Sequence, residues 1–191
     1  MPLLPTKEEI EATNEILKPY FLALGRVAHS WNHLHEELGK VFCALTGLDL
    51  SIGMAIWHSL KSDRSQRDIL EGALNSAACS SEWTERFPSA KKGVLYLLNE
   101  INNLADRRNN AIHAPCTIIP GDIEIVPLTF FGNERARRLH GKDILEEFTW
   151  YEKSADALKA HATNVRFALD SGGTWPEKPQ MPALLQGRSH G

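Results

Sequence analysis

Apolar positions recur with a helical period along most of the chain. From Phe21 to Leu45 they follow one another every three or four residues, and Trp31, Leu34 and Leu38 occupy the middle of this series. Such spacing places the apolar side chains on one face of a long helix. Gly47 predicts the end of that helix, because glycine readily adopts the backbone conformation that terminates one.

The first helical segment starts earlier and contains a proline. Thr6 and Glu9 have the spacing of a capping box, in which each side chain binds the backbone N–H of the other residue, so a helix is predicted to begin near Lys7. Pro19 lacks a backbone N–H and clashes with the preceding turn. We therefore expect Pro19 to kink or restart the helix.

Two shorter segments and another long helix follow. A short helix is expected after the loop at Gly47, and Ser62 or Asp63 can cap a third helix. Ser89 then caps a long helix that reaches at least His113. This helix must stop before Pro115, because a residue that precedes proline disfavours the helical conformation.

The pattern changes after that helix. β-branched runs flank residues 120–122, a Pro-Gly-Asp turn, and predict a β-hairpin. A last long helix is predicted over residues 143–169. The fold class is therefore mainly α, a helical bundle with a small β-hairpin inserted before the last long helix. We assign residues 1–170 to one helical domain and residues 171–191 to a Pro/Gly-rich tail.

Charge restricts how this chain can bind nucleic acid. Its 191 residues carry a net charge of −3, so attraction by bulk charge is disfavoured and RNA binding requires a local basic patch. The densest basic stretch contains His140 and four candidate RNA-binding cations, Arg135, Arg137, Arg138 and Lys142. These cations are suited to phosphate contacts. A solvated loop and helix start explain them equally well.

Metal and disulfide chemistry find little support in the sequence. Cys43, Cys79 and Cys116 are far apart and form no CxxC pair, so neither a zinc knuckle nor a disulfide framework is predicted. His29 and His33 lie one helical turn apart, but no third ligand has suitable spacing. We expect no metal and no cofactor. The absence of a signal peptide or a long apolar run predicts a cytoplasmic protein without membrane contact.

Three side chains with complementary chemistry occur near the end of the fourth long helix. Asn109 and His113 are about 40° apart on one helix face, and the long side chain of Arg108 can reach the same side. Arginine can hold a phosphate and stabilise negative charge in a transition state. Histidine transfers protons near neutral pH. RNA cleavage by the 2′-hydroxyl needs these roles and no metal.

The segment from Arg108 to His113 matches RNxxxH and so resembles the motif of the HEPN (higher eukaryotes and prokaryotes nucleotide-binding) superfamily. The resemblance implies that Arg108 is the motif arginine, Asn109 its polar neighbour and His113 the catalytic histidine. It implies a metal-independent endoribonuclease, a hydrolase that leaves cyclic phosphate ends and works as a homodimer with a composite site. Members serve in toxin–antitoxin, phage-defence or RNA-processing systems.

The same resemblance leaves a second function open. Other members have lost activity and bind RNA, nucleotides or proteins, so a non-catalytic binding module is the alternative. A separate antitoxin or nucleotidyltransferase protein is a further possible partner. The residues themselves also allow a purely structural interpretation, in which Arg107, Arg108 and His113 are cations placed to suit the dipole at the helix C-terminus. Against that interpretation, Arg108 continues the apolar stripe of Ile101 and Leu104.

Polar residues on two other helices are weaker candidates. Asn32 and His35 lie near the apolar face of the first long helix and are predicted to serve as auxiliary polar groups in the cleft of His113, although His35 is also suited to the core. Arg64 and Arg67 share one face of the third helix, with aspartates nearby. For this pair we expect an exposed ion-pair network.

Overall fold

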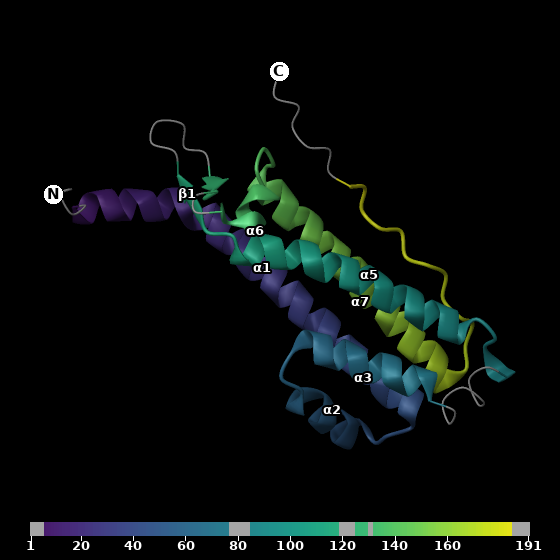
Figure 1. The fold of residues 1–191 in the computed structure, drawn as a ribbon. Coiled ribbons are helices and arrows are strands. Elements are labelled where there is room, and N and C mark those ends of the chain that lie inside the picture. Colours follow the sequence, from purple (N-terminus) through teal and green to yellow (C-terminus); the bar gives the residue numbers. More distant parts are fainter. Residues whose placement is uncertain (1–5, 77–84, 119–124, 130–131, 185–191) are drawn as a thin grey trace. The chain divides into compact units, whose positions relative to one another are not determined.

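The computed structural model describes residues 6–76, 85–118, 125–129 and 132–184 of the chain. In order, it contains helices α1 (Lys7–Thr46), α2 (Leu50–Ser59), α3 (Asp63–Asn75) and α5 (Ala90–His113), strands β1 (Cys116–Ile118) and β2 (Ile125–Pro127), and helices α6 (Glu134–Arg137) and α7 (Ile144–Ser171) (Figure 1). The prediction of a mainly α fold with a small hairpin before the last long helix is confirmed.

The chain divides into two compact units. Unit 1 consists of residues 1–28, 105–152 and 183–191, and unit 2 consists of residues 29–104 and 153–182. Each of the helices α1, α5 and α7 has one part in unit 1 and another part in unit 2. The tail contains no regular secondary structure over residues 172–184. The predicted domain boundary at residue 170 stays a prediction.

The N-terminus of α1 has the predicted capping box. The backbone N–H of Thr6 donates to Glu9 Oε2 at 2.7 Å, and the backbone N–H of Glu9 donates to Thr6 Oγ1 at 3.2 Å. The helix then continues for 40 residues with Pro19 inside it, so the predicted restart at this proline does not occur. No residue from Thr6 to Pro19 is buried, and water can therefore satisfy the carbonyl that the proline leaves without a donor.

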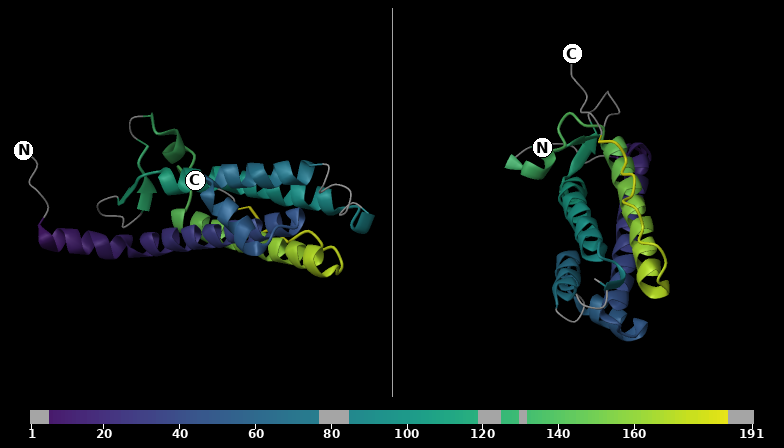
Figure 2. Two further views of the ribbon diagram at one scale, coloured as in Figure 1. Left: turned by 90° about the horizontal axis from the view of Figure 1, so that it is seen from below. Right: turned by 90° about the vertical axis from the view of Figure 1, so that its right-hand side faces the viewer.

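Unit 2 is held together by apolar faces of its helices. Figures 1 and 2 show α3 beside the N-terminal half of α5. Asp49 caps α2 by accepting a hydrogen bond from the backbone N–H of Ser51. Ser62, one of the two residues predicted to cap α3, accepts a hydrogen bond from the backbone N–H of Ser65. The largest buried side chains of this unit are Trp31, Leu34, Leu38, Trp57, Leu70, Leu97, Ile101, Leu158 and Leu169.

Helices α1 and α2 approach each other closely at two glycines. A Cβ atom at Gly53 would overlap Cys43 Sγ, and one at Gly39 would lie 2.9 Å from Met54 Sδ and 3.0 Å from Trp57 Cδ1. A side chain at either position would therefore have to displace a neighbouring side chain. A cavity of about 290 Å³ lies next to this contact, and Cys43 is one of its lining residues.

Unit 1 contains the hairpin and the basic stretch. Strands β1 and β2 are antiparallel, with Cys116 opposite Pro127 and Ile118 opposite Ile125, while the predicted turn lies outside the described residues. Part of the basic stretch is helical, because Asn133 caps the short helix α6 by accepting from the backbone N–H of Ala136. This helix was not predicted. The start of α7 agrees with the sequence, since the Asp143 side chain accepts from the first backbone N–H groups.

Candidate functional site

The RNxxxH residues lie in the last two turns of α5, within unit 1. Arg108 and Asn109 are half-buried, and Arg108 Nη1 donates to Asn109 Oδ1 at 3.0 Å. His113 is exposed in the final turn. The helix ends there because Pro115 follows, as the sequence predicts. The structure thus joins two of the three predicted catalytic side chains directly.

This arrangement suits anion binding next to a proton carrier. The amide oxygen of Asn109 accepts from the Arg108 guanidinium and so orients it, and a guanidinium is a group that binds phosphate. His113 is open to solvent, so a substrate can reach its ring. Within the described residues we find no hydrogen bond or ion pair of His113, and its predicted role at the reaction centre stays a prediction.

Side chains next to the motif are poor nucleophiles. Burial raises the pKa of the Cys116 thiol, three residues after His113, so the thiol is protonated at neutral pH. Burial also raises the pKa of Tyr20, to about 12, and contact with Cys116 adds to the effect. The chemistry available at this end of α5 is therefore that of arginine, amide and imidazole.

The predicted RNA-binding cations divide into two groups. Arg137 Nη1 pairs with Glu134 Oε1 at 2.7 Å, and Lys142 Nζ pairs with Oε1 of the buried Glu147 at 3.0 Å. Arg135 and Arg138 are exposed and form no ion pair with any described residue. These two arginines keep their charge available for phosphate.

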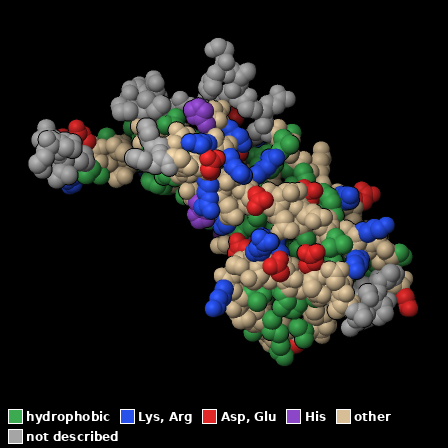
Figure 3. Space-filling view, in the orientation of Figure 1, with side chains coloured by type: hydrophobic (Ala, Val, Ile, Leu, Met, Phe, Trp, Pro, Cys, Tyr) green, Lys and Arg blue, Asp and Glu red, His purple; other side chains and the backbone are tan. Residues whose placement is uncertain are grey.

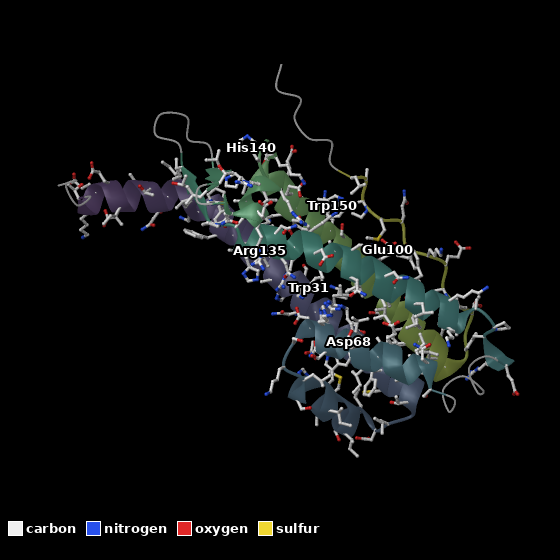
Figure 4. The ribbon with its side chains drawn as sticks, viewed as in Figure 1. Trp31, Asp68, Glu100, Arg135, His140 and Trp150 are labelled. Carbon is white, nitrogen blue, oxygen red and sulfur yellow. The ribbon has the colours of Figure 1, made fainter. Side chains whose placement is uncertain are left out.

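Figure 3 shows Lys and Arg side chains gathered over α6 and the C-terminal end of α5, both parts of unit 1. In Figure 4, Arg135 and His140 leave α6 and the following turn in different directions. The Lys and Arg side chains of this part of unit 1 are therefore spread over a surface and not concentrated at one point. A surface of this kind suits the extended backbone of a nucleic acid.

The predicted auxiliary residues belong to unit 2. Asn32 is exposed, and His35 is buried with 5% of its surface accessible. The cleft that we predicted them to share with His113 stays a prediction. His35 is instead one member of a polar group that the sequence did not suggest.

We name this group the Arg67 cluster; it consists of Trp31, His35, Arg67 and Asn102. Arg67 is buried, with 7% of its surface accessible, so the prediction of an exposed ion-pair network is wrong for this residue. Arg67 Nε donates to Asn102 Oδ1 at 2.7 Å, and Arg67 Nη1 lies 3.1 Å from His35 Nε2. The guanidinium also lies 5.9 Å from the centroid of the Trp31 ring, which Figure 4 labels.

The Arg67 cluster defines the state of His35. A guanidinium can only donate, so His35 Nε2 accepts, and the ring hydrogen must be on Nδ1. His35 Nδ1 lies 3.1 Å from the backbone oxygen of Trp31 and donates to it. His35 is therefore neutral in this arrangement. The sequence does hold a clue to the cluster, since Arg67 occupies the same helical stripe as Leu70 and Leu74.

The remaining candidate residues are two histidines of α1 and the cysteines. The rings of His29 and His33 lie 4.2 Å apart between centroids, and both residues are exposed. The described residues contain no group of three or more His, Cys, Asp or Glu side chains arranged to hold a metal. Nor does any helix in the described part of the chain combine the length and apolarity needed to cross a membrane. Cys43 is buried, Cys116 is half-buried, and Cys79 lies outside the described residues.

The sequence did not predict two side-chain arrangements, the Arg67 cluster and a contact between Arg107 and Trp150. Both join residues that are far apart along the chain. Comparisons of the chain with protein-family models, with curated proteins and with solved structures gave no match.

Proposed function

We propose that this protein is a metal-independent endoribonuclease of the HEPN type. The observation that carries the proposal is the hydrogen bond from Arg108 to Asn109 in the last turns of α5, one turn from the exposed His113. An oriented cation and an accessible imidazole at one helix end are what cleavage by a 2′-hydroxyl needs. The RNxxxH spacing supports the same conclusion.

In the proposed reaction, His113 removes the proton of a ribose 2′-hydroxyl, and the 2′-oxygen attacks the adjacent phosphorus. The bond from phosphorus to the 5′-oxygen breaks, which leaves a 2′,3′-cyclic phosphate and a 5′-hydroxyl. Arg108 stabilises the additional negative charge on the phosphate, and Asn109 holds the guanidinium in place. The leaving 5′-oxygen takes its proton from His113 of a second copy. The active species is therefore a homodimer.

The test is cleavage of total RNA in the presence of EDTA, followed by mapping of the new ends. We expect cyclic phosphate ends with the parent protein. His113→Ala should reduce the rate by about 100-fold or more, the usual range for loss of a general base. His33→Ala, which removes another exposed histidine, is the matched control and should cleave like the parent. Equal cleavage by all three proteins, or none by the parent, would refute the proposal.

The dimer has its own test. Analytical ultracentrifugation at micromolar concentration should show a species of twice the chain mass. A strict monomer that still cleaves RNA would contradict the composite site and leave the ribonuclease chemistry standing.

A non-catalytic binding module is the second candidate, and one observation favours it. Three large apolar side chains of α2 are exposed, with 55% of Leu50, 56% of Ile52 and 37% of Ile56 accessible, and Figure 3 shows hydrophobic atoms over this helix. Contiguous apolar surface of this kind marks interaction sites. A separate antitoxin or nucleotidyltransferase protein is the partner proposed for it. In that case the parent protein would leave RNA intact just as His113→Ala does, and Ile52→Lys would abolish partner binding without a change in melting temperature.

A further inference from the structure

Next to the motif, an arginine and a tryptophan form a cation–π contact. The guanidinium of Arg107, on α5, lies over the ring of Trp150, on α7, with 5.1 Å from Arg107 Cζ to the ring centroid. Arg107 is exposed and Trp150 is half-buried, and both belong to unit 1 (Trp150 is labelled in Figure 4). We call this pair the stacking platform.

The platform is supported from within the unit. The ring of the buried Tyr151 meets that of Trp150 edge-on, with 5.4 Å between centroids and 71° between planes. Burial raises the pKa of the Tyr151 hydroxyl, with a further contribution from the neighbouring carboxylate of Glu147, so Tyr151 is neutral and acts as a fixed support. Because Arg107 is the exposed member, its planar group is the part that a ligand meets.

A role in neutralising a carboxylate does not explain Arg107. Among the residues that the structure describes, none forms an ion pair with it. Its charge is thus available, in contrast to that of Arg137 and Lys142 in the same unit. A general preference for cations at a helix C-terminus accounts for a charge at this position, but not for its stacking on an aromatic ring.

We propose that the stacking platform of Arg107 and Trp150 binds an unpaired RNA base beside the phosphate that Arg108 contacts, and so selects single-stranded over duplex RNA. This inference rests on the proposed function. Unpaired bases stack on aromatic rings and on arginine planes, whereas the faces of bases within a duplex are covered by their neighbours. Arg107 and Arg108 are consecutive on α5 and their side chains leave it about 100° apart, so one nucleotide can place its base on the first and its phosphate at the second.

The chemistry of the platform also predicts how the base is recognised. Every base has a π-face, so stacking tolerates any sequence. Stacking depends less on salt than phosphate contacts do, which matters for a chain whose net charge is −3. The stacking platform therefore adds affinity for RNA to that provided by the basic surface of unit 1.

The experiment measures RNA binding by fluorescence anisotropy, with each substitution placed in the His113→Ala protein so that the probe stays intact. The probes are a labelled unstructured RNA oligonucleotide, a blunt RNA duplex, and the same oligonucleotide without bases. Arg107→Lys keeps the charge and removes the plane, and it should weaken binding of the unstructured RNA by about 10-fold. Trp150→Leu should do the same. Arg64→Lys, at an exposed position in unit 2, is the matched control and should change the affinity by less than about twofold.

The outcomes separate this inference from the proposed function. If the parent protein cleaves RNA but Arg107→Lys binds it unchanged, the platform is refuted and the ribonuclease stands. If Arg107→Lys weakens binding while the parent never cleaves, the platform stands and the ribonuclease fails. Equal affinity for the duplex, or for the oligonucleotide without bases, refutes the platform. Binding of no probe at all refutes both.

Discussion

Replacing Gly53 with alanine tests the closest helix contact in unit 2. An alanine Cβ would have ordinary contacts with Cys43 Cβ at 3.4 Å and Leu48 Cβ at 3.6 Å, but it would overlap Cys43 Sγ. The sulfur atom is thus the one obstacle within reach. Cys43 has a single side-chain rotation, and the cavity of about 290 Å³ that it lines gives the sulfur somewhere to move.

Two opposing effects determine the size of the change. Alanine in place of glycine within a helix stabilises by about 1 kcal/mol. Inserting a methyl group into a packed contact costs about 1–3 kcal/mol. We therefore expect Gly53→Ala to lower the free energy of unfolding by about 1 kcal/mol. In the Cys43→Ala background the obstacle is absent, and the same substitution should stabilise by about 1 kcal/mol. The coupling energy between the two sites is then about 2 kcal/mol.

Urea unfolding of the four proteins of this double-mutant cycle measures the coupling. Gly72→Ala is the matched control, because a Cβ at this α3 position meets nothing within 4 Å. It should stabilise by about 1 kcal/mol, which is about 2–4 °C in melting temperature for a chain of this size. If Gly53→Ala stabilises as much as Gly72→Ala, or if the two sites of the cycle are additive, the close contact between α1 and α2 is refuted.

Three further predictions concern buried polar groups. Arg67→Met removes the donors of two hydrogen bonds and should lower the free energy of unfolding, measured in urea, by about 2–4 kcal/mol. Arg67→Lys should restore little of this loss. A smaller loss for Arg67→Met would mean that the Arg67 cluster contributes little stability. Burial lowers the pKa of His161 below 6.5, so the unfolded chain binds the proton more readily than the folded protein does. The free energy of unfolding should therefore be highest above pH 6.5 and decrease as the pH falls. His161→Phe should flatten this pH dependence, and an unchanged pH dependence would contradict the prediction. The pKa of Tyr20 is raised from 10.0 to about 12, so the free energy of unfolding should decrease as the pH rises through this interval. A pH titration of tyrosinate absorbance should show one tyrosine fewer in Tyr20→Phe than in the parent protein.

Local rules predicted most of the helices correctly. The capping box of Thr6 and Glu9, the cap at Ser62 and the end of α5 before Pro115 all depend on residues within four positions of one another. Such local preferences act before any tertiary contact forms, so the sequence alone is enough to infer them. The hairpin was also predictable, from β-branched runs on either side of a turn.

Tertiary contacts limited the prediction elsewhere. The charge of Arg67 suggested an exposed surface, but His35 and Asn102, from two other helices, provide the acceptor atoms that allow its burial. Pro19 was predicted to kink or restart the helix, and no restart occurs because its exposed position makes the missing hydrogen bond tolerable. The partners of a side chain depend on helices distant in sequence, and a periodic pattern contains no information about them.

For the candidate site, the motif identified the residues and the structure supplied one of their contacts. The spacing of Arg108 and Asn109 did not predict their hydrogen bond, since side chains of consecutive residues point about 100° apart. Nor did the sequence connect Arg107 with Trp150, which lies on another helix. The residue types were therefore predictable, but their pairing was not.

The unbroken course of α1 through Pro19 has a consequence for hydrogen exchange. The segment from Thr6 to Pro19 buries no side chain, and a helix of this length is marginal in water when it stands alone. Its amides should exchange with deuterium early, while those around Leu34 and Leu38, in the same helix, exchange only when unit 2 opens. One continuous helix would thus unfold as two cooperative segments.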